Sequence, residues 1–97
     1  MSIQISTTSE FQTAIAAGQL EAAETWLNGI RLNPENWPQY DARWLDHRER
    51  ELFRALCKAH YWSGAKRIVE VTADPTSKIG RLNRLEELSG LKYDQVS

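Results

Sequence analysis

The chain has 97 residues, of which 41% are apolar and 26% are charged, and its formal net charge is −1. This composition predicts one globular domain and excludes a disordered chain, which would have too little apolar surface to bury. The near-zero charge provides no global field to attract nucleic acid or anionic lipid, and no apolar run approaches the roughly 18 residues of a membrane span. The single cysteine excludes an internal disulfide, and the first residues lack the features of a secretory signal, so we expect a cytoplasmic protein.

The first apolar pattern predicts a helical hairpin over residues 6–32. Thr7 and Glu10 have the spacing of a capping box at the start of its first helix, and Gly18 ends that helix. The second helix places apolar residues three and four apart, at Leu20, Ala23, Leu27 and Ile30. Residues 33–40 contain two prolines and are expected to form a loop.

A second hairpin is predicted over residues 41–72. Asp41 is a suitable N-cap for a long helix. The second half of this helix carries a core stripe: Leu52, Phe53, Leu56, Cys57 and Ala59. Residues 46–51 are charged on every side, so we expect them in solvent or against a partner. Pairs four residues apart would stabilise this segment, namely Asp46–Arg50 and His47–Glu51.

A fifth helix is predicted over residues 74–90, where Asp74 provides the cap and Pro75 the first helical position. Residues 91–97 are expected to be a short tail. The whole chain, 1–97, is therefore predicted to be a single all-α domain of five helices: two packed hairpins and a C-terminal capping helix.

The apolar pattern of the first hairpin recurs 42 residues later in the second. Its members are Phe11, Ile15, Ala17, Leu20, Ala23 and Leu27, answered by Phe53, Cys57, Ala59, Trp62, Ala65 and Val69. The order of Gly18, Leu20, Ala23 and Leu27, followed by Pro34, resembles the second half of a tetratricopeptide repeat, although the family's period is 34. This resemblance implies a groove that binds a peptide or protein. Residues 62–70 and 84–90 also resemble segments of short bacterial proteins of unassigned function, and that likeness implies no activity.

Two groups of side chains are candidate binding surfaces. The first is an aromatic surface bordered by arginines: Trp37, Tyr40, Arg43, Trp44 and Arg48. Tryptophan, tyrosine and arginine dominate binding hot spots, and the alternative is that this loop folds back and Trp37 closes the end of the first hairpin. The second group is a basic row on the fifth helix that would face the phosphates of a nucleic acid: Lys78, Arg81 and Arg84.

No pattern indicates a metal, a cofactor or a reaction. Cys57 and His60 lie one helical turn apart, but structural zinc sites normally use four ligands. The acidic residues of 46–51 have no nucleophile or glycine-rich loop beside them. We therefore predict a non-enzymatic module, an adaptor or inhibitor that binds a protein or peptide. A nucleic-acid-associated protein is the alternative, an oligomeric enzyme is the least favoured one, and the first helix is a candidate homodimer interface.

Overall fold

The computed structural model describes residues 4–97. Its helices are α1 (Thr8–Ala16), α2 (Leu20–Leu32), α3 (Ala42–Lys58), α4 (Trp62–Val71) and α5 (Pro75–Ser89), with short 3-10 turns η1 (Pro34–Asn36) and η2 (Tyr93–Gln95). Within the described range every regular element is helical, so the predicted all-α class is confirmed. The expectation about a secretory signal falls partly on residues 1–3, which lie outside the described residues.

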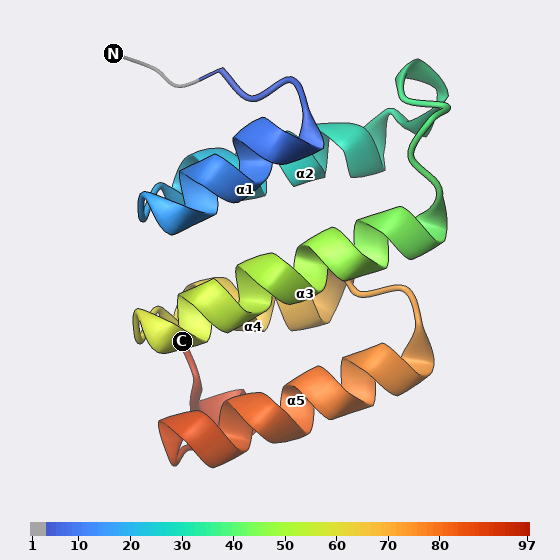
Figure 1. The fold of residues 1–97 in the computed structure, drawn as a ribbon. Coiled ribbons are helices and arrows are strands. Elements are labelled where there is room, and N and C mark those ends of the chain that lie inside the picture. The colour runs from blue at the N-terminus through green and yellow to red at the C-terminus, as the bar shows by residue number, and fades with distance from the viewer. Residues whose placement is uncertain (1–3) are drawn as a thin grey trace.

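The helices form two layers. In Figure 1, α1, α3 and α5 lie side by side in the front layer, and α2 and α4 lie behind them. The first hairpin is α1 with α2, the second is α3 with α4, and α5 packs against both helices of the second hairpin. No helix in residues 4–97 is long and apolar enough to cross a membrane.

The two hairpins turn in the same way. Ala17 and Ala59, which follow α1 and α3, both have φ −85° and ψ 0°. The next residue is left-handed in each case, with φ of 79° at Gly18 and 61° at His60. The amide that follows donates to the carbonyl five residues earlier at 2.9 Å in both turns. The 42-residue offset of the sequence pattern is therefore also present in the backbone.

The core runs continuously through both hairpins and into α5. Its most completely buried large side chains are Phe11, Leu27, Leu52, Ile68, Val69 and Leu85. Each helix thus contributes one apolar face, as the spacing of three and four residues requires.

Residues 46–51 of α3 are predicted to lie in solvent or against a partner, and Glu49 departs from this prediction. Glu49 is only 2% exposed, and it pairs with Arg31 of α2 and Arg81 of α5. Burial raises the pKa of the Glu49 carboxyl, although the two arginines act to lower it. A buried carboxylate needs such partners, since an unpaired charge in the interior is strongly unfavourable.

The predicted pairs within α3 are also wrong. Asp46 pairs with Arg81 at 3.1 Å rather than with Arg50. Glu51 pairs with Arg48 at 2.8 Å rather than with His47. Helix spacing allows several pairings, and here contacts with neighbouring helices decide among them.

The segment predicted as a tail is part of the fold. Val96 is 3% exposed and packs with the core. Lys66 of α4 donates to the Val96 carbonyl at 2.7 Å and lies 4.9 Å from the centre of the Tyr93 ring. The last residues therefore fold back onto α4.

Candidate interaction surface

The aromatic residues of the predicted surface pack around Trp26 of α2. Tyr40 stacks on Trp44 with ring centroids 3.8 Å apart, and Trp37 meets the edge of Trp26 at 6.2 Å. The Trp44 indole also donates to the Thr8 hydroxyl at 3.2 Å. Trp37, Tyr40 and Trp44 are half-buried, so they close the end of the first hairpin and join it to the start of α3.

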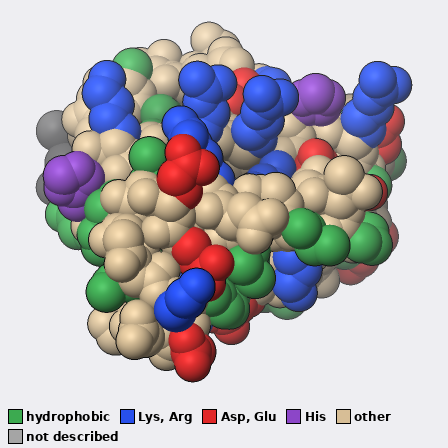
Figure 2. All heavy atoms as spheres, turned by 90° about the horizontal axis from the view of Figure 1, so that it is seen from below, with side chains coloured by type: hydrophobic (Ala, Val, Ile, Leu, Met, Phe, Trp, Pro, Cys, Tyr) green, Lys and Arg blue, Asp and Glu red, His purple; other side chains and the backbone are tan. Residues whose placement is uncertain are grey.

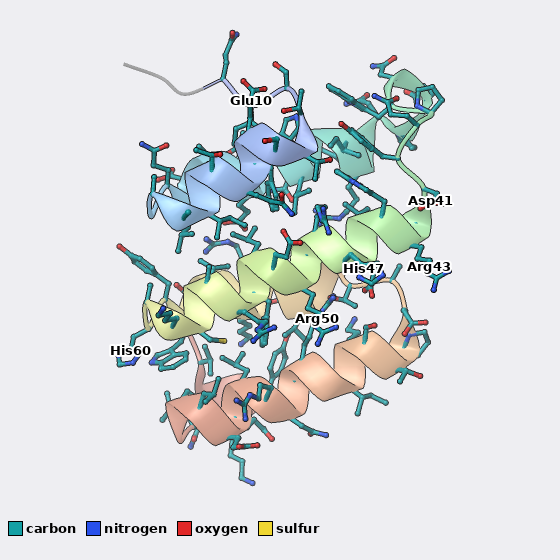
Figure 3. The ribbon with its side chains drawn as sticks, viewed as in Figure 1. Glu10, Asp41, Arg43, His47, Arg50 and His60 are labelled. Atoms are coloured by element: carbon teal, nitrogen blue, oxygen red, sulfur yellow. The ribbon has the colours of Figure 1, made fainter. Side chains whose placement is uncertain are left out.

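The two arginines predicted to border this surface lie apart. Arg48 lies 5.9 Å from the centre of the Trp44 ring and pairs with Glu51 of the same helix. Arg43 is exposed and lies with His47 and Arg50 along another side of α3 (Figure 3). The predicted patch therefore divides into a packed aromatic cluster and a separate basic surface.

The basic row predicted on α5 is broken at its centre. Arg81 is 7% exposed and donates to the Thr72 hydroxyl and the Asp46 carbonyl, each at 2.8 Å. The prediction that Arg81 faces phosphates is wrong, because its guanidinium is turned into the core toward the buried acid of α3. Lys78 and Arg84 are exposed, and Arg84 pairs with Glu87 at 2.9 Å.

A basic stripe occupies the outer face of α3, and we call it the α3 basic stripe. Its members are Arg43, His47, Arg50, Arg54 and Lys58. Their spacing of four, three, four and four residues places them on one side of the helix, over about 22 Å. All five are exposed, and within residues 4–97 none takes part in an ion pair. Figure 2 shows basic side chains gathered along the upper edge of the view, where acidic ones are few.

The acidic side chains of α3 are engaged elsewhere. Asp46 and Glu49 face Arg81, and Glu51 pairs with Arg48. Neighbours such as Arg50 and Arg54 repel each other, because like charges four residues apart destabilise a helix. Within residues 4–97 no acid lies within ion-pair distance of the stripe, so its charges make no ion pair that would stabilise the fold.

Sequence reasoning missed this stripe although its signal was present. Residues 46–51 are charged on every side when taken alone, which hides the regular spacing. Extending the window from Arg43 to Lys58 reveals the basic positions on one helical face.

A groove of about 380 Å³ lies between the end of α3 and α5, and we call it the α3–α5 groove. Its apolar lining is Phe53, Cys57, Trp62 and Leu88, and its polar lining is Arg54, Lys58, His60 and Arg84. The His60 ring stacks on Trp62 at 5.1 Å, which holds the imidazole at the opening. Burial raises the pKa of the Cys57 thiol, and the Arg84 charge acts to lower it. A neutral thiol is a weak nucleophile, so Cys57 serves as part of the apolar wall.

A larger groove of about 950 Å³ lies between α2 and α4. Arg67 makes two hydrogen bonds to Glu24 across it, at 2.9 and 3.0 Å, so its main charges neutralise each other. Among the described residues no three histidine, cysteine, aspartate or glutamate side chains gather as metal ligands. The α3 basic stripe with its adjoining groove is therefore the best candidate site.

Comparison with known proteins yields no relative: neither the protein-family models, nor the curated proteins, nor the solved structures contain a match to this chain.

Proposed function

We propose that the chain is a non-enzymatic interaction module that binds an acidic segment of a protein partner along the α3 basic stripe. The observation that carries this proposal is a row of five exposed basic side chains without an ion-pair partner in residues 4–97. Potentials across protein interfaces are complementary, so such a row favours carboxylates on the partner. As in tetratricopeptide arrays, stacked hairpins would provide the rigid support. We place the module in the cytoplasm, where a lone cysteine remains reduced.

Three properties favour a protein partner over a nucleic acid. The chain has a sequence pI of about 6.1, whereas nucleic-acid-binding domains are typically basic overall. The stripe carries no tryptophan, tyrosine or phenylalanine on which a base could stack. The apolar groove at its end suits the side chain of a peptide rather than a phosphate.

In this proposal the aromatic cluster supports the site without forming its contact surface. Trp44 and Tyr40 fix the first turn of α3 against Trp26 of α2. The stripe begins at Arg43, within that same turn. A helix whose first turn is fixed by packing keeps its charges in place, which reduces the entropy lost when a partner binds.

The test is affinity capture from a lysate of the source organism, with and without nuclease, read by mass spectrometry. The stripe variant is Arg43→Ala with Arg50→Ala. The matched control is Lys78→Ala with Lys92→Ala, which removes the same charge from exposed positions outside the stripe. We expect a stoichiometric protein with an acidic segment that survives nuclease, is lost with the stripe variant and is retained by the control.

Two other outcomes would change the conclusion. Partners that disappear on nuclease treatment would indicate that the stripe binds nucleic acid instead of a protein. Partners that bind the stripe variant as well as the wild type would show that α3 does not carry the interaction.

A further inference from the structure

The α3 basic stripe and the α3–α5 groove form one continuous surface. Arg54 and Lys58 belong to both, because each lines the groove while standing on the stripe. A partner that follows the stripe therefore meets the groove at the C-terminal end of α3. In protein interfaces a few side chains buried in desolvated pockets supply most of the affinity.

The internal repeat allows the lining of this groove to be compared with the same turn of the first hairpin. The positions that line it in the second hairpin have equivalents 42 residues earlier, at the same turn of the first. The equivalents of Arg54, Lys58 and His60 are Gln12, Ala16 and Gly18. The turn of the first hairpin therefore has the same backbone conformation without these basic side chains, and the turn of the second has it with them.

His60 is the most informative of these differences. Its φ of 61° lies in the left-handed region, which glycine adopts readily and other residues adopt with strain. The first hairpin has glycine at the equivalent position, with φ of 79°. Backbone strain of this kind concentrates at functional sites, and here it presents an imidazole beside Trp62 at the opening of the groove.

From these observations we propose that the partner's acidic segment carries one large apolar side chain, which occupies the α3–α5 groove. This inference rests on the proposed function and specifies its ligand. The apolar side chain contacts Trp62 and Leu88, while flanking carboxylates face Arg54 and Lys58. Leu88 is 43% exposed in the free chain and would be covered in the complex.

The test is fluorescence anisotropy of the full chain with two labelled synthetic peptides at low salt. Both peptides consist of glutamates around one central residue, which is leucine in one and alanine in the other. We expect the leucine peptide to bind about tenfold more tightly, because its side chain buries more apolar surface. Leu88→Ala should remove this advantage. The control Ile79→Ala changes another exposed apolar residue of α5 outside the groove and should retain it.

The outcomes separate the two proposals. Equal affinity for both peptides, lost on Arg43→Ala with Arg50→Ala, would overturn the apolar side chain and leave the basic stripe intact. No binding of either peptide at low salt would overturn both. Equal weakening of both peptides by Leu88→Ala would also contradict the inference, since the alanine peptide places no large side chain in the groove.

Discussion

The two hairpins share a backbone and differ in what they present to solvent. Both turn through an alanine with φ −85° and a left-handed residue. The exposed positions of the first are uncharged where those of the second are basic, as in Gln12 against Arg54 and Ala16 against Lys58. Because the turn is specified by backbone hydrogen bonds and a small apolar core, its outer residues are free to diverge. The residues that the two hairpins share stabilise the fold. The exposed residues that differ between them are the candidates for binding a partner.

The buried faces of the two hairpins also differ, and here the first hairpin carries the distinctive residue. Trp26 of α2 lies within 6.2 Å of Trp37, Tyr40 and Trp44, measured between ring centroids. The equivalent position of α4 is Ile68, an aliphatic side chain that is also buried. The first hairpin thus contributes Trp26, the centre of the aromatic cluster, and the second contributes the α3 basic stripe.

Removing Trp26 from the aromatic cluster should have the largest effect on the free energy of unfolding. Trp26→Ala should lower the free energy of unfolding by about 3–5 kcal/mol, because it leaves a cavity among the surrounding rings. Urea unfolding followed by circular dichroism would measure the loss. A loss below about 1 kcal/mol would mean that the cluster does not join the first hairpin to α3.

Breaking the buried ion pairs of Glu49 should have the second-largest effect on stability. Arg81→Ala should destabilise the chain by about 3 kcal/mol at neutral pH, because Glu49 then keeps only Arg31 as a partner. Folding raises the pKa of Glu49, so the folded state binds this proton more readily than the unfolded state does. The Arg81 charge lowers this pKa, so the Arg81→Ala deficit should be largest at neutral pH and shrink as the pH falls through the raised pKa of Glu49.

Urea titrations of the wild type and Arg81→Ala across this pH range would measure that dependence. The control makes the same Arg81→Ala change in Glu49→Gln, where no carboxylate remains at this position, and measures the deficit relative to Glu49→Gln alone. The pH-dependent part of the deficit should vanish there. A deficit that is constant with pH in the single variant would contradict the role assigned to Glu49.

Giving the second hairpin the surface of the first is the sharpest test of their difference. The triple variant Arg54→Gln, Lys58→Ala and His60→Gly should weaken binding of the acidic leucine peptide by more than about tenfold. Its stability should stay within about 1 kcal/mol of the wild type, since all three side chains are exposed. Anisotropy and urea unfolding of the same preparation would measure both effects. Unchanged affinity would show that the divergence between the hairpins is not functional.

Substitutions at the left-handed residue of each turn should change stability by smaller amounts and with opposite signs in the two hairpins. His60→Gly should raise the free energy of unfolding by up to about 1 kcal/mol, because it relieves a left-handed backbone. Gly18→Ala should lower it by about 1 kcal/mol, since a Cβ at this position meets no atom within 4 Å and only the φ of 79° opposes it. Thermal unfolding of both variants would test this. Stabilisation by Gly18→Ala would show that the turns do not share the same constraint.

The smallest expected effect concerns repulsion along the stripe. Arg54→Gln should stabilise the chain by about 0.5 kcal/mol at low salt, because Arg54 has a basic neighbour four residues away on each side. The gain should disappear at high salt, where charges on the surface are screened. Chemical unfolding at two ionic strengths would detect it. A gain that persists at high salt would point to packing or helix propensity instead.

The helices were largely predictable because their signals are local. Thr7, Asp41 and Asp74 each accept a hydrogen bond at the helix start where the sequence placed a cap. Gly90 ends α5 in the left-handed conformation that a glycine after a helix suggests. The pairings of charges were not predictable in the same way. Helical spacing offered Asp46 a partner in Arg50, while its actual partner, Arg81, lies on another helix.

The sequence by itself determined the helical class, the positions of the caps and the repeat of 42 residues, because each depends on neighbours along one helix. Only the tertiary structure decided which charges are buried and which remain free. Packing α5 against α3 turned Arg81 inward to Glu49, and the return of the last residues covered Val96. The same packing left the outer face of α3 without acidic partners among the described residues. Burial and ion pairing depend on the distance between helices, which no local pattern contains.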